Sequence, residues 1–335
     1  MKNKTTIIAE IGQAHDGSLG ILHSLIEAAA SAGVDAVKFQ VHIADSESTL
    51  YEPFRINFSY EDKNRYEYWK RMEFTFQQWQ DIKKKCEDLN LEFLATPFSN
   101  AAVDLLESLE VKRYKIGSGE FNNLLLIDKI IKTKKEILLS TGMSSIEEIE
   151  FIVERIKKAG NKLCIFQCTS SYPTNPSEIC LGALPQLKER FSCSTGLSDH
   201  SGDIFACLAA VSLGATFVEV HITFSQKMFG PDSYSSLNIE NLTRLVKGIR
   251  FIEKAKKGDL SQKNLKNNSH NRSIFGKSLY LRKDIKKNEK LNFDHLEAKK
   301  PGEIGISPIH YEKILGKVAI KDLQKGKLLE YRDLL

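Results

Sequence analysis

The sequence predicts a (β/α)8 barrel, or TIM barrel, followed by a small domain rich in β-structure. Eight short apolar runs alternate with amphipathic helical stretches over about 250 residues, the usual size of such a barrel. A polar segment rich in Lys and Asn then separates this region from a C-terminal part with a different residue pattern. In this chain of 335 residues we expect the barrel at 1–255, a linker at 256–272 and the small domain at 273–335. A doubly wound sheet is the alternative, but no glycine-rich phosphate loop follows the first apolar run.

The apolar runs have the length and the residue types of buried strands. They are 5–12, 36–41, 92–97, 113–117, 136–141, 163–168, 193–198 and 216–223. Segment 145–159 illustrates the helices between them, because Ser145 can cap it and its apolar residues recur at helical spacing. A further helix is expected at 239–255.

The small domain carries an internal repeat. Asp284, Leu291 and Leu296 recur as Asp322, Leu329 and Leu334, at a constant offset of 38 residues. Each copy follows a β-like run, so the repeat predicts two similar halves. Because a domain of about 60 residues has a marginal core, we expect it to dock on a barrel.

Composition excludes several classes of protein. Hydrophobic residues make up 41% and charged residues 27%, unlike a disordered, collagen-like or coiled-coil chain. No apolar run approaches the roughly 18 residues of a membrane span, and the start has no signal-peptide pattern. The six Cys lie in apolar contexts outside any CxxC pair, so we expect reduced core thiols in a cytoplasmic protein.

The net charge of +5 is unevenly distributed. The chain from Lys256 onward has 19 Lys and Arg against 10 Asp and Glu, whereas the preceding part is slightly acidic. No aromatic residues accompany these cations as a stacking platform, so we interpret them as a solvated basic face and expect neither nucleic-acid nor membrane binding.

Polar residues gather at the carboxyl ends of the expected strands, where TIM barrels hold their catalytic groups. Buried lysines need partners, so Lys38 and Lys115 favour an anionic ligand, and the hydroxyls of Thr96, Ser118 and Ser140 suit a phosphate. The alternative is a set of interior ion pairs, such as Lys38 with Glu10. The residues at these ends are Glu10, Lys38, Gln40, Thr96, Lys115, Ser118, Glu120, Ser140, Thr141, Gln167, Thr169, Tyr172, Asp199, His200, Glu219 and His221.

His200 and His221 follow neighbouring strands and predict a site for a divalent transition ion such as Mn²⁺. Glu219 shares the strand face of His221 and would ligate the ion or orient its water. Either histidine alone is more typical of a hydrogen-bonded rim residue. His15 and Asp16 line the mouth or simply form a turn.

The sequence resembles the bacterial sialic acid synthase family, which comprises N-acetylneuraminate, legionaminate and pseudaminate synthases. The resemblance rests on an ordered set of motifs over nearly the whole chain. They are AEIG at 9–12, DAVKFQ at 35–40, TPFS at 96–99, YKIGSGE at 114–120, LSTGM at 139–143, QCTSSYP at 167–173, GLSDHS at 196–201, H-x-T at 221–223 and GPD at 230–232. KKPGEIGISP at 299–308 resembles the antifreeze-like (SAF) domain of that family.

The resemblance implies that phosphoenolpyruvate condenses with an N-acetylated amino sugar to give a nine-carbon keto acid and phosphate. By motif position, phosphoenolpyruvate would be held by Lys38, Thr96, Lys115, Ser118 and Ser140. His200 and His221 would hold Mn²⁺ or another divalent ion such as Mg²⁺ or Co²⁺, which polarises the sugar aldehyde. Glu120, Tyr172 and Asp232 would contact the sugar. Glu10 is the candidate for positioning the attacking water, with Glu120 as the alternative.

The resemblance also implies a domain-swapped homodimer in which the small domain reaches the partner's barrel. Lys300 stands where the family usually has an Arg that contacts the sugar, and Lys cannot make the same two-pronged contact. Ala14, Asp16, Ser170 and Ser233 also depart from the usual residues, and these changes cluster where the sugar would lie. They suggest the same reaction on a modified sugar, a legionaminate- or pseudaminate-type precursor beside N-acetylmannosamine.

Two other functions compete with this one. Another phosphoenolpyruvate-condensing barrel would use a sugar phosphate, although the small C-terminal domain argues against it. A non-catalytic carbohydrate- or ice-binding protein would need a flat, weakly charged surface, which the many Lys of the small domain disfavour.

Overall fold

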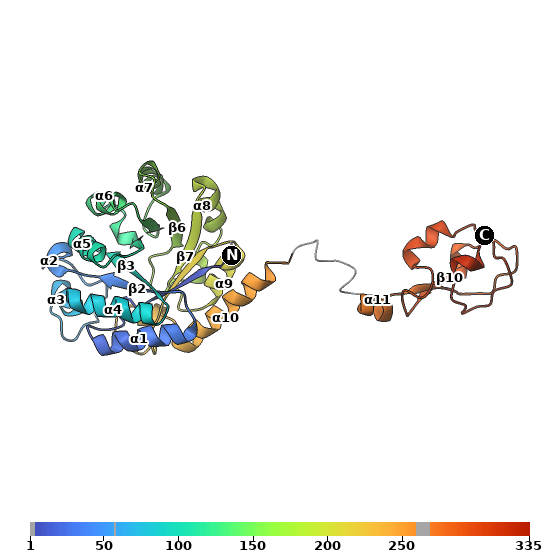
Figure 1. The fold of residues 1–335 in the computed structure, drawn as a ribbon, viewed down its shortest axis with the longest axis horizontal. Coiled ribbons are helices and arrows are strands. Elements are labelled where there is room, and N and C mark those ends of the chain that lie inside the picture. The colour runs from blue at the N-terminus through green and yellow to red at the C-terminus, as the bar shows by residue number, and fades with distance from the viewer. Residues whose placement is uncertain (1–3, 57, 259–268) are drawn as a thin grey trace. The chain divides into compact units, whose positions relative to one another are not determined.

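A computed structural model describes residues 4–56, 58–258 and 269–335 (Figure 1). The chain divides into two compact units at the bond between Lys256 and Lys257. Residues 269–272, which we expected to belong to the linker, are the first residues of helix α11 (Ser269–Phe275). Residues 259–268 of the expected linker lie outside the described residues.

The first unit is a barrel of eight parallel strands, which confirms the expected fold. The hydrogen-bonded order is β3-β2-β1-β8-β7-β6-β5-β4, and β3 and β4 also pack against each other, which closes the sheet. The strands are β1 (Thr6–Glu10), β2 (Ala36–Val41), β3 (Glu92–Pro97), β4 (Arg113–Ile116), β5 (Glu136–Ser140), β6 (Leu163–Cys168), β7 (Ser194–Asp199) and β8 (Phe217–His221). Each lies within or within one residue of an apolar run predicted from the sequence.

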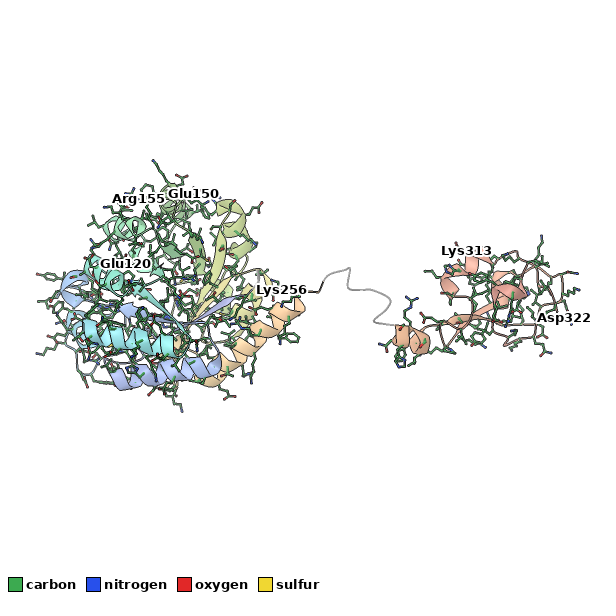
Figure 2. The ribbon with its side chains drawn as sticks, in the orientation of Figure 1. Glu120, Glu150, Arg155, Lys256, Lys313 and Asp322 are labelled. Carbon is green, nitrogen blue, oxygen red and sulfur yellow. The ribbon has the colours of Figure 1, made fainter. Side chains whose placement is uncertain are left out.

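Helices surround the sheet on its outer side (Figure 1). They are α1 (Leu19–Ala32), α2 (Ala44–Glu47), α3 (Arg65–Met72), α4 (Phe76–Asp88), α5 (Asn100–Ser108), α6 (Leu124–Lys132), α7 (Ile146–Lys158), α8 (Ala183–Phe191), α9 (Phe205–Ser212) and α10 (Ile239–Ala255). The expected cap of α7 is present, because Ser145 and Glu148 form a reciprocal capping box. On the outer surface Arg155 pairs with Asp128 of α6 and Glu150 with Arg190 of α8, so exposed ion pairs link neighbouring helices (Figure 2).

Two apolar layers fix the position of the site. The larger one fills the space between the sheet and the helices. The smaller one lies inside the barrel and consists of Ile8, Ala36, Leu94, Leu138, Cys164, Phe166 and Phe217. Most of these residues come from the first half of their strands, so they form a floor and leave the carboxyl ends for polar side chains.

The small unit has the two similar halves that the repeat predicts. Ile285 and Leu323, which are 38 positions apart, exchange backbone hydrogen bonds of 2.9 Å in both directions. The Asp284 carboxylate accepts from the backbone N–H of Lys325 at 2.7 Å, and Asp322 accepts from that of Lys287 at 2.8 Å. These reciprocal contacts are the signature of an internal two-fold arrangement. Strands β9 (Ser278–Leu281) and β10 (Leu296–Lys299) form its antiparallel sheet.

Two further expectations concern cysteines and membranes. All six Cys are free thiols, and the half-buried Cys193 packs against the core, but Cys180 is exposed, so the expectation of a core position is wrong for Cys180. In the part of the chain that the structure describes, no helix has the length and apolarity needed to cross a membrane.

Candidate active site

The carboxyl ends of the barrel strands surround a cavity of about 540 Å³. All but one of the site residues predicted from the sequence line this cavity. They are Glu10, Lys38, Thr96, Lys115, Ser118, Glu120, Ser140, Ser170, Tyr172, His200, Glu219, His221 and Asp232. The exception is Lys300, which belongs to the small unit, where its ammonium lies 5.3 Å from the centre of the Phe275 ring.

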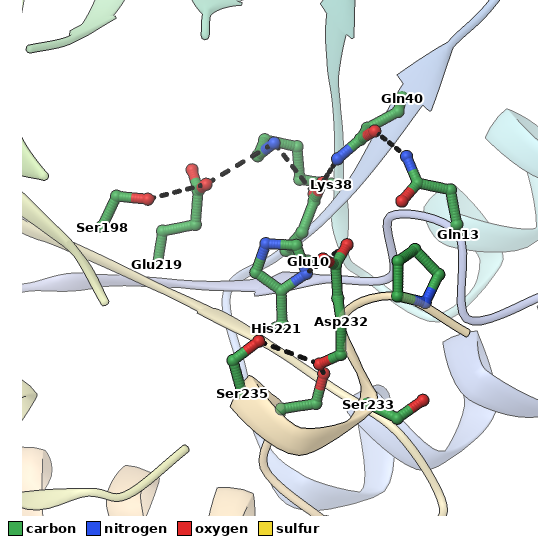
Figure 3. Close-up of polar contacts among 12 residues, drawn as sticks. Glu10, Gln13, Lys38, Gln40, Ser198, Glu219, His221, Asp232, Ser233 and Ser235 are labelled. Carbon is green, nitrogen blue, oxygen red and sulfur yellow. Dashed lines mark hydrogen bonds and ion pairs between the residues drawn. The ribbon is translucent and has the colours of Figure 1, made fainter. Parts of the chain in front are cut away.

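A buried network of charges occupies the deepest part of the cavity (Figure 3). The Lys38 ammonium lies 2.9 Å from a carboxylate oxygen of Glu10 and donates to the Thr96 hydroxyl at 3.2 Å. Glu219 lies between the two lysines, at 2.8 Å from Lys115 and 3.5 Å from Lys38, and also accepts from Ser198. The interior ion pairs that we considered as an alternative are therefore present, and they line the same cavity as the hydroxyls.

These ion pairs decide which groups are charged. Burial alone would lower the pKa of Lys38, but the carboxylates of Glu10 and Glu219 raise it above its ordinary value. Burial alone would raise the pKa of Glu219, but Lys115 and Lys38 hold it well below its ordinary value. We expected Glu219 to ligate the ion or to orient its water, but both of its oxygens contact the lysines and Ser198, an arrangement that suits a role in placing the lysines.

Small and hydroxyl-bearing residues form one wall of the cavity, the serine pocket (Ser118, Ser140, Ser170 and Gly142). The Ser118 hydroxyl accepts from the backbone N–H of Gly142 at 3.0 Å. The Ser140 hydroxyl is buried and has no hydrogen-bond partner within the described residues. Gly142 has no side chain here because an added Cβ would lie 2.5 Å from the Ser170 hydroxyl. The Ser118 hydroxyl lies 3.6 Å from the Cys168 sulfur, so the Ser140 hydroxyl is the unused donor that this wall offers to an anion.

The two predicted metal-binding histidines lie together on the opposite wall. The centres of their rings are 5.3 Å apart, and Tyr172 stacks on His200 at 4.1 Å. The Nδ1 of His200 lies 2.8 Å from the Thr169 carbonyl, so it carries the hydrogen and leaves Nε2 as the electron-pair donor. Burial lowers the pKa of His200 to about 3, which keeps the imidazole neutral, and the neighbouring His221 acts in the same direction.

This donor set fits a divalent ion only as a two-imidazole site. Asp232 approaches His221, with its carboxylate 3.8 Å from Nδ1. Among the described residues, no group of three or more His, Cys, Asp or Glu has the geometry to hold an ion. An ion held here would complete its coordination with water and substrate oxygens, which suits an open catalytic site.

The outer part of the cavity is built by residues that the sequence prediction missed. Arg55, from the segment between α2 and α3, donates to the Asp232 carboxylate at 2.5 Å and lies 4.2 Å above the centre of the Tyr172 ring. Phe54, Phe58, Trp69 and Phe98 add an aromatic wall. Glu120 also lines the cavity, and partial burial raises its pKa.

Several polar residues at the strand ends do not line the cavity. Gln167 donates to the Ile179 carbonyl, Thr141 to the Phe166 carbonyl, and Asp199 accepts from Ser201. His15 accepts from the backbone N–H of Gly17 at 3.0 Å and so belongs to the turn that we considered as its alternative. These residues hold loops in place.

The fold and the cavity define a TIM barrel with a polar cavity, lined by lysines, hydroxyls and histidines, at the carboxyl ends of its strands. Known proteins identify this barrel as an enzyme of one family. The model of the NeuB family matches residues 25–261, and that of the SAF domain matches residues 276–335. The chain therefore belongs to the NeuB family, whose members include nonulosonic (sialic) acid synthases.

Two relatives from Campylobacter jejuni match almost end to end. The N,N'-diacetyllegionaminic acid synthase is 39% identical over 97% of this chain and 99% of its own length. The pseudaminic acid synthase is 35% identical over 98% of this chain and 96% of its own length. Among solved structures, the N-acetylneuraminic acid synthetase of Leptospira borgpetersenii superposes with a TM-score of 0.70 at 30% identity, covering 80% of this chain and 92% of the other.

Proposed function

We propose that this enzyme condenses phosphoenolpyruvate with an N-acetylated amino sugar to give a nonulosonic acid and inorganic phosphate. The observation that carries the proposal is the cavity itself, which joins two buried lysines, a serine pocket with an unpartnered hydroxyl, and two adjacent imidazoles. An anion, a carbonyl compound and a divalent ion would each find complementary groups there.

In this proposal phosphoenolpyruvate lies deep in the cavity. Lys115 uses one donor on Glu219, so it has donors left for the anion, and the serine pocket supplies hydroxyl hydrogens. Thr96 is fixed by Lys38 and completes the contact. These groups stabilise the phosphate and carboxylate charges without having to reorganise.

The bonds change in a fixed order. Carbon 3 of phosphoenolpyruvate attacks the sugar's aldehyde carbon, and water adds at carbon 2 to give a tetrahedral intermediate. That intermediate expels phosphate as the bond between carbon 2 and the bridging oxygen breaks. Glu10 orients the water and accepts its proton, since Gln40 and Lys38 hold its carboxylate at the base of the cavity, and this proton balances the one that the aldehyde oxygen takes up as it becomes a hydroxyl. A divalent ion at His200 and His221, Mn²⁺ by preference, would supply Lewis-acid polarisation of the aldehyde.

An isotope experiment tests which bond of phosphoenolpyruvate breaks. Phosphoenolpyruvate with ¹⁸O in the bridging position should pass all of its label to the released phosphate. Label retained in the organic product would contradict cleavage of the carbon–oxygen bond.

The sugar is N-acetylmannosamine or a 2,4-diacetamido-2,4,6-trideoxyhexose, and two observations favour the second. The aromatic wall offers contacts to methyl groups, which a deoxy sugar with two acetyl groups carries in greater number. The name of the relative with 39% identity, a diacetyllegionaminic acid synthase, points in the same direction. Tyr172, Asp232, Ser170 and Glu120 would contact this substrate.

The serine pocket gives a prediction about phosphoenolpyruvate. An added methyl group in Gly142→Ala would collide with the Ser118 and Ser170 hydroxyls, so we expect the KM for phosphoenolpyruvate to rise by about tenfold or more. The KM for the sugar should change little. Gly182→Ala is the matched control, because nothing lies within 4 Å of the position of its added Cβ. Equal KM values for G142A and G182A would exclude this pocket as the phosphate site.

We also propose a homodimer in which Lys300 of one subunit completes the cavity of its partner. The prediction is complementation between two inactive variants, Lys115→Ala and Lys300→Ala. After equimolar mixing and subunit exchange, about a quarter of the sites would combine an intact barrel with an intact Lys300, so activity should return to about that fraction of the parental value. No recovery in a mixture proven to contain hybrid dimers would refute the shared site.

A further inference from the structure

A buried histidine that the proposed reaction does not use lies beside the cavity. His42 directly follows β2, and its ring lies between those of Trp69 and Phe98, with centres 3.9 and 4.4 Å away and nearly parallel planes. Its Nδ1 is 2.6 Å from a carboxylate oxygen of Glu47, and its Nε2 is 3.1 Å from the side-chain oxygen of Gln40. Both ring nitrogens therefore have a polar partner.

The hydrogen-bond pattern indicates that Nε2 of His42 carries a hydrogen. The Gln40 amide nitrogen donates to Glu10 at 2.9 Å, so the amide oxygen of Gln40 faces the other way, toward Gln13 and His42. Figure 3 shows the hydrogen bonds that join Glu10, Gln40 and Gln13. A carbonyl oxygen only accepts, so Nε2 of His42 donates to it. The Gln13 amide donates to the same oxygen, which explains why the Gln13 and His42 nitrogens lie 3.5 Å apart.

The other ring nitrogen also carries a hydrogen. Glu47 uses its second oxygen to accept from the backbone N–H of Ile43 at 3.1 Å, so both of its carboxylate oxygens act as acceptors. The aromatic rings above and below His42 favour a cation between them. A doubly protonated imidazole paired with a carboxylate satisfies all of these contacts.

We infer that His42 is a charged positioning residue: paired with Glu47 and stacked between Trp69 and Phe98, it fixes the amide of Gln40 and thereby the carboxylate of Glu10. Without the donor from His42, only the Gln13 amide still holds the Gln40 oxygen, so the Gln40 amide is fixed less firmly and its hydrogen bond to Glu10 weakens. The inference rests on the proposed function in one respect: the carboxylate that His42 and Gln40 orient is that of Glu10, which positions the water in the proposed reaction.

Two variants separate packing, hydrogen bonding and charge. His42→Phe keeps the stack of rings and removes the donor, and kcat should fall by about 10- to 100-fold while both KM values stay within about threefold. Glu47→Gln removes the charge, but its amide can donate to Nδ1, so Nε2 keeps its hydrogen and kcat should stay within about threefold. His23→Phe on α1, outside the cavity, is the matched control. A kcat for H42F equal to that of H23F would overturn the inference.

Two NMR measurements decide the inference independently of activity. With ¹⁵N-labelled histidine, the ring signals that disappear in H42F should show both nitrogens protonated at neutral pH in the parental protein, and one unprotonated nitrogen in E47Q. The side-chain amide of Gln40, assigned with Gln40→Met, should exchange its hydrogens slowly in the parental protein and fast in H42F. If the parental protein releases no phosphate with any sugar, the proposed function fails, and these signals still test the hydrogen-bond chain. A neutral His42 ring, or equal exchange in the two proteins, would overturn it.

Discussion

Replacing Glu219 with glutamine should lower the free energy of unfolding of the barrel by about 3 kcal/mol, because it leaves two buried ammonium groups with one carboxylate. Lys115 would lose its ion pair, and Lys38 would retain only Glu10. Activity should be lost together with stability, since the lysines would no longer be held in place. Urea unfolding followed by tryptophan fluorescence measures the effect, because Trp69 and Trp79 both lie in the barrel.

Glu150→Gln provides the matched control for this variant. Glu150 pairs with Arg190 on the outer surface, where both side chains are largely exposed, and such pairs contribute about 0–1 kcal/mol. The same chemical change should therefore be nearly silent there. If E219Q and E150Q have the same unfolding free energy, the charge network inside the barrel is not formed in solution.

Replacing His200 with alanine should reduce phosphate release by about 10³-fold, which corresponds to the several kcal/mol that a Lewis acid supplies. The reason is the arrangement of His200, whose Nδ1 is committed to the Thr169 carbonyl and whose neutral ring lies beside His221. The variant should also bind less Mn²⁺, as measured by metal analysis after dialysis. Chelation of the parental protein should give the same loss of activity, reversed by added Mn²⁺.

His23→Ala serves as the control, since His23 lies on α1 outside the cavity. It should retain the parental activity and metal content. A folded H200A protein that keeps both its metal and its rate would exclude the two-histidine site.

The barrel could be predicted because each strand is short, apolar and followed by a periodic helix. The same reasoning did not find α2, α3 and the loop between them, because α2 has only four residues and α3 only eight, too few to show a clear period. Its structure depends on Tyr68, Trp69 and Met72 packing with Phe54 and Phe58, contacts between residues that are not neighbours in the sequence. Arg55 reaches the cavity only because of this packing.

Site residues could be predicted where we used the rule that successive side chains of a strand point to opposite faces. Strand-end residues that were named without this rule do not all line the cavity. Ser198 and His200 are two residues apart and both face the cavity, whereas Asp199 between them does not. The same rule excludes Gln167, which alternates with Phe166 and Cys168 of the barrel interior. The same rule keeps Gln40, which is two residues after Lys38, was named among the strand-end residues and lines the cavity. No rule of spacing reveals that His42 and Glu47 form a pair.

Phosphate release with a panel of sugars tests the proposed function most directly. Purified protein would receive phosphoenolpyruvate, Mn²⁺ and, in turn, N-acetylmannosamine, its 6-phosphate, 2,4-diacetamido-2,4,6-trideoxyhexoses and arabinose 5-phosphate. We predict release with an unphosphorylated amino sugar, strongest with a diacetamido-trideoxyhexose and abolished by chelation, together with a nine-carbon keto acid of matching mass. Release with arabinose 5-phosphate alone would contradict this account and assign the enzyme to the sugar-phosphate-dependent condensations.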